Sequence, residues 1–184
     1  VHEVFKQLTG LGRAGELKHI WQAPFTLHSK LIAAIQAEAD AARTGRKGRI
    51  IAKMNSLLEP QIVSALYEAS EAGVEIDLIV RGVCALRPGV PGLSDNIRVR
   101  SVVGRFLEHS RIFYFYADGA ERTYLSSADW MERNLDRRIE VMVPITHPKH
   151  QAWLDQVLEF DLSDDAVRWE LQPDGEWMRR GPVD

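Results

Sequence analysis

The sequence predicts a single α/β domain in which helices flank a mixed β-sheet. Strand-like and helix-like segments alternate from residue 26 to residue 80, and Asp118-Gly119 is a hairpin signal between two later strand-like segments. The 184 residues are enough for one well-buried core. Alternation predicts parallel strand pairs and the hairpin predicts an antiparallel pair, so we expect both kinds in one sheet.

The first predicted core element is a helix over residues 26–43. Apolar residues recur there at three- and four-residue spacing, for example at Leu31 and Ile35, which is typical of an amphipathic helix. Gly45 follows the helix and favours its end. Residues 1–22 combine a short apolar pattern with a glycine-rich turn at residues 9–12, and we expect a lead-in there rather than a core element.

A strand–helix–strand unit follows. Residues 50–54 and 74–80 have strand composition, and the helix between them begins near Pro60, a residue tolerated in a first turn. This spacing predicts two parallel strands. Arg81 then falls just beyond the carboxyl end of the second strand, the edge where open α/β sheets bind ligands.

The rest of the chain predicts more strands, one more helix and a terminal hairpin. Residues 86–96, with two prolines and two glycines, read as a loop, and Pro173-Asp174-Gly175 marks a hairpin within residues 166–180. A helix over 147–160 should bury the face that carries Trp153, Leu154, Val157 and Leu158. Strands are predicted at residues 97–103, 111–116, 121–126 and 138–144.

Composition excludes several classes of protein. The net charge of -3 argues against nucleic acid as a partner, and no apolar run approaches the roughly 18 residues that a membrane span needs. Cys84 is the single cysteine and cannot form an intrachain disulfide, and no signal-like segment opens the chain, so we expect a cytoplasmic location. Because the first residue is Val1 and not Met, we expect a processed protein or a segment of a longer one.

The charge distribution is more informative than the total. Ten arginines and no lysine lie between residues 54 and 147, and residues 81–111 hold six arginines against two acidic residues, a balance of 6 - 2 = +4. Arginine presents a fork of donors that fits phosphate oxygens in pairs, so this stretch favours oxyanion recognition. Structural ion pairs with the thirteen acidic residues between residues 54 and 147 are the alternative.

His109 and Arg111 are the leading candidate site. Two residues apart and ahead of a predicted strand, they should project from one face at the strand's mouth. An imidazole can attack phosphorus, act as acid or base, or donate to a phosphate oxygen. A structural histidine is the alternative, but further donors of the type that a phosphate site needs lie nearby in the sequence, at Arg105, Ser126, Ser127 and Asn134.

Other constellations favour structural roles. His28-Ser29-Lys30 has the His-x-Lys form of phospholipase D-like enzymes, but it lies in a predicted helix, where positions i and i+2 point about 200° apart. Glu132, Asp136 and Glu140 could bind a metal, yet arginines interleave with them, so we expect ion pairs and no metal site. No Cys/His cluster has zinc spacing and no P-loop is present.

Several sequence blocks, in order, resemble the C-terminal domain of bacterial polyphosphate kinase, the long multidomain enzyme. The resemblance runs from about Phe5 to the terminal hairpin. The blocks that carry it are Lys53-Met54-Asn55-Ser56-Leu57, Ile79-Val80-Arg81-Gly82-Val83-Cys84, Leu86-Arg87-Pro88-Gly89, the run from Arg98 to Arg111, and Tyr124-Leu125-Ser126-Ser127-Ala128-Asp129-Trp130-Met131.

The resemblance implies a fold and a function. Residues 23–184 would form the second of two phospholipase D-like domains, and residues 1–22 would lead in from the preceding domain. The substrates would be ATP (or ADP) and polyphosphate, with ATP contacts from Arg81 and His109. The phosphorylated histidine and the magnesium contacts would lie in the preceding domain of the same chain, which would be the partner of this one. We expect the whole protein to form a homo-oligomer, and its peripheral association with the membrane stays an open alternative.

The chain departs from the full phospholipase D motif at two positions. Arg111 replaces the lysine and Tyr116 replaces the aspartate. We therefore expect Arg111 to bind phosphate and His109 to assist phosphoryl transfer as acid/base or donor, without forming the main intermediate. Alone, the 184 residues should be nearly inactive. The alternatives are a phospholipase D-like phosphodiesterase and a non-catalytic phosphate-binding or oligomerisation module.

Overall fold

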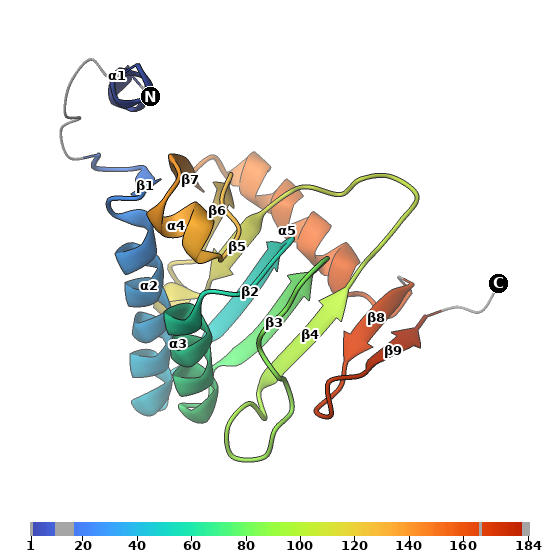
Figure 1. Cartoon of the computed structure of the whole chain (residues 1–184). Helices are drawn as coiled ribbons and strands as arrows, with labels where there is room; N and C mark the ends of the chain where they lie inside the picture. Colours follow the sequence, from blue (N-terminus) through green and yellow to red (C-terminus); the bar gives the residue numbers. More distant parts are fainter. Residues whose placement is uncertain (1, 10–16, 166, 182–184) are drawn as a thin grey trace.

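The computed structural model describes residues 2–9, 17–165 and 167–181, and over this part it shows a nine-stranded mixed sheet with helices on both faces (Figure 1). The predicted α/β class is confirmed. The strands are β1 (Trp21–Ala23), β2 (Arg49–Met54), β3 (Glu75–Val80), β4 (Ile97–Ser101), β5 (Ile112–Phe115), β6 (Arg122–Ser126), β7 (Glu140–Ile145), β8 (Arg168–Leu171) and β9 (Trp177–Arg180). The helices are α1 (His2–Leu8), α2 (Leu27–Arg43), α3 (Pro60–Glu71), α4 (Glu132–Asp136) and α5 (Pro148–Leu162), with a 3₁₀ turn η1 (Ala117–Gly119).

The strand order determines which chain segments meet at each edge of the sheet. The order is β1-β7-β6-β5-β2-β3-β4-β8-β9, with β2, β3 and β4 parallel and β5 antiparallel to β2. β6 is antiparallel to β5 and therefore runs with β2. One edge thus collects the carboxyl ends of β2, β3, β4 and β6 together with the amino end of β5.

Two hydrophobic layers enclose the sheet. α2 and α3 cover one face, where Ile35 and Leu66 join a core with Ile50 and Leu78, all fully buried. α5 covers the opposite face, behind the sheet in Figure 1, where Leu154 packs in a smaller cluster. Side chains of successive strand residues point to opposite faces, so the central strands are apolar on both.

α5 presents a narrower apolar face to the sheet than predicted. Leu154 and Leu158, four residues apart, are buried and Val157 is partly buried, but Trp153 is 63% exposed. The expectation that Trp153 is buried is therefore wrong. One residue is a step of about 100° around a helix, which turns Trp153 away from the row that contacts the sheet.

The sheet begins slightly earlier in the chain than expected. Trp21 and Gln22 belong to β1, which pairs antiparallel with β7, although residues 1–22 were expected to lie outside the core. A strand of three residues is too short to show an alternating pattern. Beyond Thr9, the predicted turn at 9–12 lies outside the described residues.

The predicted turns join the strands as expected. η1 contains Asp118 and Gly119 at φ 57° and 88° and connects the antiparallel pair β5–β6. The terminal hairpin β8–β9 is present too, and β8 extends the sheet by pairing with β4. At the start of α3, the Glu59 carboxylate accepts a hydrogen bond from the backbone N–H of Ile62 at 2.7 Å, which caps the helix ahead of Pro60.

Candidate functional site

The candidate site starts where β2 and β3 end side by side. Arg81 follows β3, and its backbone N–H donates to the carbonyl of Met54 at 3.1 Å. The N–H of Gly82 donates to the carbonyl of Asn55 at 2.8 Å, and a Cβ at Gly82 would lie 2.9 Å from that oxygen. Glycine is therefore needed for this close approach, which places Arg81 beside Asn55.

His109 reaches the same edge from the loop that joins β4 to β5. Asn55 Nδ2 lies 3.5 Å from His109 Nδ1, a long contact that brings the imidazole to the end of β2. The guanidinium of Arg111 donates from Nη1 to the carbonyl of His109 at 3.2 Å. The sequence-predicted residues Arg81, His109 and Arg111 thus gather at one edge of the sheet.

Arg111 is paired with a carboxylate. Its Nε and Nη2 donate to the two oxygens of Asp129 at 2.8 and 3.0 Å, and both side chains are largely buried. Burial alone would raise the pKa of Asp129, but the hydrogen bonds from Arg111 and from the N–H of Asn55 outweigh burial and hold this pKa below its ordinary value. Asp129 therefore stays charged and balances Arg111.

Two other arginines of the site have no such partner. Among the described residues, the guanidinium groups of Arg81 and Arg105 form no hydrogen bond or ion pair; Arg81 is partly exposed and Arg105 is exposed. The ring of His109 is exposed as well. An anion arriving at this edge would meet an uncommitted guanidinium and an imidazole without displacing a protein carboxylate from Arg81.

Ser126 and Asn134, two of the further donors predicted near the site, form hydrogen bonds within the protein. Ser126 Oγ donates to the carbonyl of Val141 at 3.1 Å and accepts from the N–H of Ala128 at 3.0 Å. The amide of Asn134 donates to Glu140 at 2.8 Å, and Asn134 is buried. These contacts hold the segment after β6 against β7.

The arginine-rich stretch contains both arginines in structural ion pairs and arginines without an ion pair, the two alternatives that the sequence left open. Besides Arg111, Arg98 and Arg100 lie near the buried carboxylate of Asp77, each at 3.7 Å, and are structural ion pairs. Among the described residues, the guanidinium groups of Arg81, Arg87 and Arg105 form no ion pair. Of these three, Arg81 and Arg105 belong to the candidate site and are suited to oxyanion recognition.

The His-x-Lys sequence of α2 has a structural role at its histidine. His28 Nδ1 lies 2.9 Å from Asp136, and Nε2 lies 3.2 Å from Glu59, the cap of α3. This histidine therefore joins α2 to two neighbouring helices. Glu132 pairs with Arg137 at 2.6 Å, as the interleaved charges predicted. Across the described residues, no group of three or more His, Cys, Asp or Glu side chains is arranged to hold a metal ion.

A buried ion pair lies beneath the His109 loop. Lys53 on β2 is 4% exposed and pairs with Asp161 on α5, which is 6% exposed. Lys53 Nζ also lies 3.8 Å from Glu108. The hydrogen bond from the Ser110 hydroxyl lowers the pKa of Glu108, and the charge of Lys53 adds to that effect, so Glu108 meets Lys53 as a carboxylate.

The sequence pattern gave no role to Asn55, Asp129 or Lys53. Asn55 could have been found by the reasoning that singled out Arg81, because it directly follows the neighbouring parallel strand. Asp129 and Lys53 carry no comparable signal. Their partners lie 18 and 108 positions away, and only the fold brings them together.

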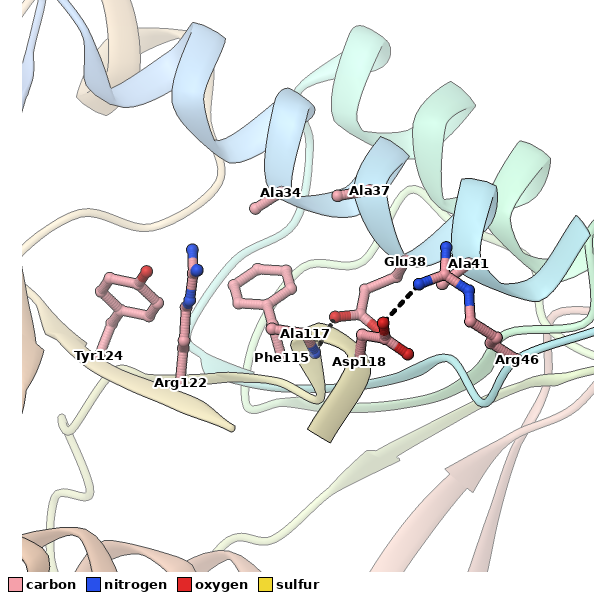
Figure 2. A pocket seen from close by; sticks show the side chains of 10 residues that line it. All are labelled: Ala34, Ala37, Glu38, Ala41, Arg46, Phe115, Ala117, Asp118, Arg122 and Tyr124. Carbon is pink, nitrogen blue, oxygen red and sulfur yellow. Dashed lines mark hydrogen bonds and ion pairs between the residues drawn. The ribbon is translucent and has the colours of Figure 1, made fainter. Parts of the chain in front are cut away.

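A separate pocket of about 300 Å³ lies at the opposite edge of the sheet, between α2 and the β5–β6 turn (Figure 2). Three of its charged groups have partners: Arg46 pairs with Asp118, and Glu38 accepts from the backbone N–H of Ala117. Burial raises the pKa of Glu38 despite these hydrogen bonds. This pocket contains none of the sequence-predicted site residues.

Comparison with known proteins assigns the family. The sequence model of the family described as "Polyphosphate kinase C-terminal domain 2" matches residues 20–184. The chain belongs to this polyphosphate kinase family. The polyphosphate kinase of Burkholderia multivorans is 60% identical over 181 residues, which cover 98% of this chain and 26% of that protein. The chain therefore spans about a quarter of the length of the curated relatives that it matches.

Solved structures agree with this assignment. The crystal structure of polyphosphate kinase from Porphyromonas gingivalis superposes with a TM-score of 0.93 at 36% identity, over all of this chain and 28% of that one. Nuc from Salmonella typhimurium, a phospholipase D family member, shares the fold with a TM-score of 0.57 at 13% identity, over 89% of this chain and 97% of that one. The expected phospholipase D-like fold of the family is thus confirmed. No helix in the described part is long and apolar enough to cross a membrane.

Proposed function

We propose that this polyphosphate kinase domain supplies a nucleotide-binding half of a phosphotransfer site. In the whole protein, the terminal phosphate of ATP would pass reversibly to polyphosphate. The observation that supports the proposal best is that an uncommitted arginine, Arg81, and an exposed imidazole, His109, come to the same edge of the sheet, at the ends of the neighbouring strands β3 and β2. Family membership supports ATP and polyphosphate as the substrates.

The side chains would act mainly by positioning and by neutralising charge, as in most phosphoryl transfers. Arg81 would hold phosphate oxygens, and Arg105 would add positive charge from the loop. His109 would donate a hydrogen bond to the transferred phosphoryl group or exchange a proton with it. Arg111, balanced by Asp129, would contribute its remaining N–H groups to phosphate and support the His109 backbone.

Other parts of the reaction are proposed to lie outside this domain. The phosphorylated histidine and the magnesium contacts would lie in the preceding domain, as the family resemblance implies, and residues 1–22 would connect to it. The roles proposed above are those of this domain's own side chains. A cytoplasmic location and a homo-oligomeric state stay predictions.

The proposal is tested in the full-length protein by measuring polyphosphate synthesis from ATP. We expect Arg81→Ala to raise the KM for ATP and His109→Ala to lower kcat by about 10²- to 10⁴-fold, the usual contribution of a positioned acid or base. Arg179→Ala on β9, an exposed arginine distant in the strand order, is the matched control and should leave both constants unchanged.

Mapping of a trapped phosphopeptide separates the two domains' roles. Radiolabel from the terminal phosphate of ATP should reside on a histidine outside these 184 residues. Label on His109, or normal synthesis by His109→Ala, would contradict the proposed role.

A further inference from the structure

The position of His109 depends on a small number of contacts. Most of the loop between β4 and β5 is exposed, including Val103, Phe106 and Leu107 at 53–83% exposure. Two of its neighbours touch His109 itself: Asn55 contacts ring atom Nδ1, and Arg111 donates to the backbone carbonyl. Side chains that fix these two neighbours therefore influence where the imidazole lies.

Both neighbours are held by the same carboxylate. Asp129 Oδ1 accepts from the backbone N–H of Asn55 at 2.8 Å and from Arg111 Nε at 2.8 Å, while Oδ2 accepts from Arg111 Nη2 at 3.0 Å. Asp129 is 7% exposed. One buried group thus joins the end of β2 to the segment that enters β5.

We propose that Asp129 is a positioning residue for His109, acting through Asn55 on the ring and through Arg111 on the backbone. The arrangement restrains His109 at two points, its ring and its backbone carbonyl, although the loop is exposed. Paired charges that are buried and bidentate hold geometry better than exposed ones, because little solvent competes for the donors. This inference rests on the proposed function of His109.

The first test uses the full-length protein with Asp129→Asn, which keeps the side chain's size and removes its charge. We expect kcat to fall by about 10- to 100-fold, the scale produced when a reacting group shifts by roughly 1 Å. The loss should divide between kcat and KM in the same way as the loss in His109→Ala. Glu38→Gln is the matched control, since Glu38 is an equally buried carboxylate bonded to backbone N–H groups at the opposite edge of the sheet.

The decisive measurement is a double-mutant cycle. If Asp129 acts through His109, then Asp129→Asn should cost less than about twofold in the His109→Ala background, because residues that act as a unit are not additive. The same 10- to 100-fold loss in both backgrounds would overturn the inference. So would an equal loss in Glu38→Gln.

Two further arms keep the test interpretable. Asn55→Ala removes only the ring contact at a partly exposed position, and it should reproduce a milder form of the same pattern even if Asp129→Asn does not fold. Calorimetric binding of a non-hydrolysable ATP analogue repeats the cycle without turnover. A wild-type protein that neither makes polyphosphate nor binds the analogue would overturn the proposed function and this inference together, whereas additive losses in an active wild type would overturn this inference alone.

Discussion

Removing Asp161 should strongly destabilise the domain. The variant Asp161→Ala would leave the ammonium of Lys53 buried on β2, with only Glu108 at 3.8 Å as a remaining counter-charge. Breaking a buried ion pair in this way costs about 3–5 kcal/mol. Because Glu108 is half exposed and still nearby, we expect the lower end, about 3 kcal/mol, which corresponds to a fall in Tm of about 6–12 °C for a chain of this size.

The assay is urea unfolding of the 184-residue chain, with Tm from calorimetry. Two comparison variants test whether the lost stability comes from an uncompensated buried charge. Lys53→Met with Asp161→Leu removes both charges and should restore most of the stability, since an apolar pair of similar volume replaces the ion pair. Arg137→Ala breaks an exposed pair, 72% and 60% exposed, and should cost below about 1 kcal/mol. A double variant as unstable as Asp161→Ala would refute the reasoning, because the loss could not then come from an uncompensated charge.

Three more predictions concern the site and its support. Gly82→Ala should lower the free energy of urea unfolding by about 1–3 kcal/mol and weaken nucleotide binding, because the new Cβ would meet the Asn55 carbonyl at 2.9 Å. Gly104→Ala is the control: nothing lies within 4 Å of its Cβ, so its effect should stay within about 0.5 kcal/mol. The lowered pKa of Asp129 contributes stability that is present above the unfolded-state pKa and is lost as pH falls through the folded-state pKa. The difference in unfolding free energy between wild type and Asp129→Asn should therefore shrink from about pH 5 to pH 2. A difference that stays constant over this range would contradict the prediction. Trp130→Phe should cost less than about 1.5 kcal/mol in unfolding free energy, and Trp130→Ala about 3–5 kcal/mol. The reason is that the buried indole N–H has no hydrogen-bond partner among the described groups, so the side chain stabilises through its ring volume. Equal losses in the two variants would contradict this reason.

Local patterns predicted most of the fold because the hydrophobic periodicity of a helix or strand can be recognised within a short run of residues. The helix from Leu27 and the β2–α3–β3 unit were found within a residue or two of their ends. The pattern failed where an element is short, as in β1, or where the buried face is narrow, as at Trp153.

The candidate site was predictable only in part. Arg81 follows from the rule that ligands bind at the carboxyl ends of parallel strands, and His109 with Arg111 follows from chemistry and proximity in sequence. The partner of Arg111 did not follow, because pairing with Asp129 depends on how the segment after β6 folds back. The sequence therefore predicted the residues that gather at the candidate site better than the residues that hold them in place.

The pairing of Arg111 with Asp129 has a consequence for how tightly this domain can hold nucleotide. Since that guanidinium is already balanced, the positive charge left for a ligand comes mainly from Arg81 and Arg105. A nucleoside triphosphate carries more negative charge than two guanidinium groups can balance. Counterions therefore compete effectively for it at an open edge, and its affinity for this domain alone should fall steeply as ionic strength rises. Under the proposed function, the remaining positive charge would come from outside the domain, and tight nucleotide binding would require that contribution.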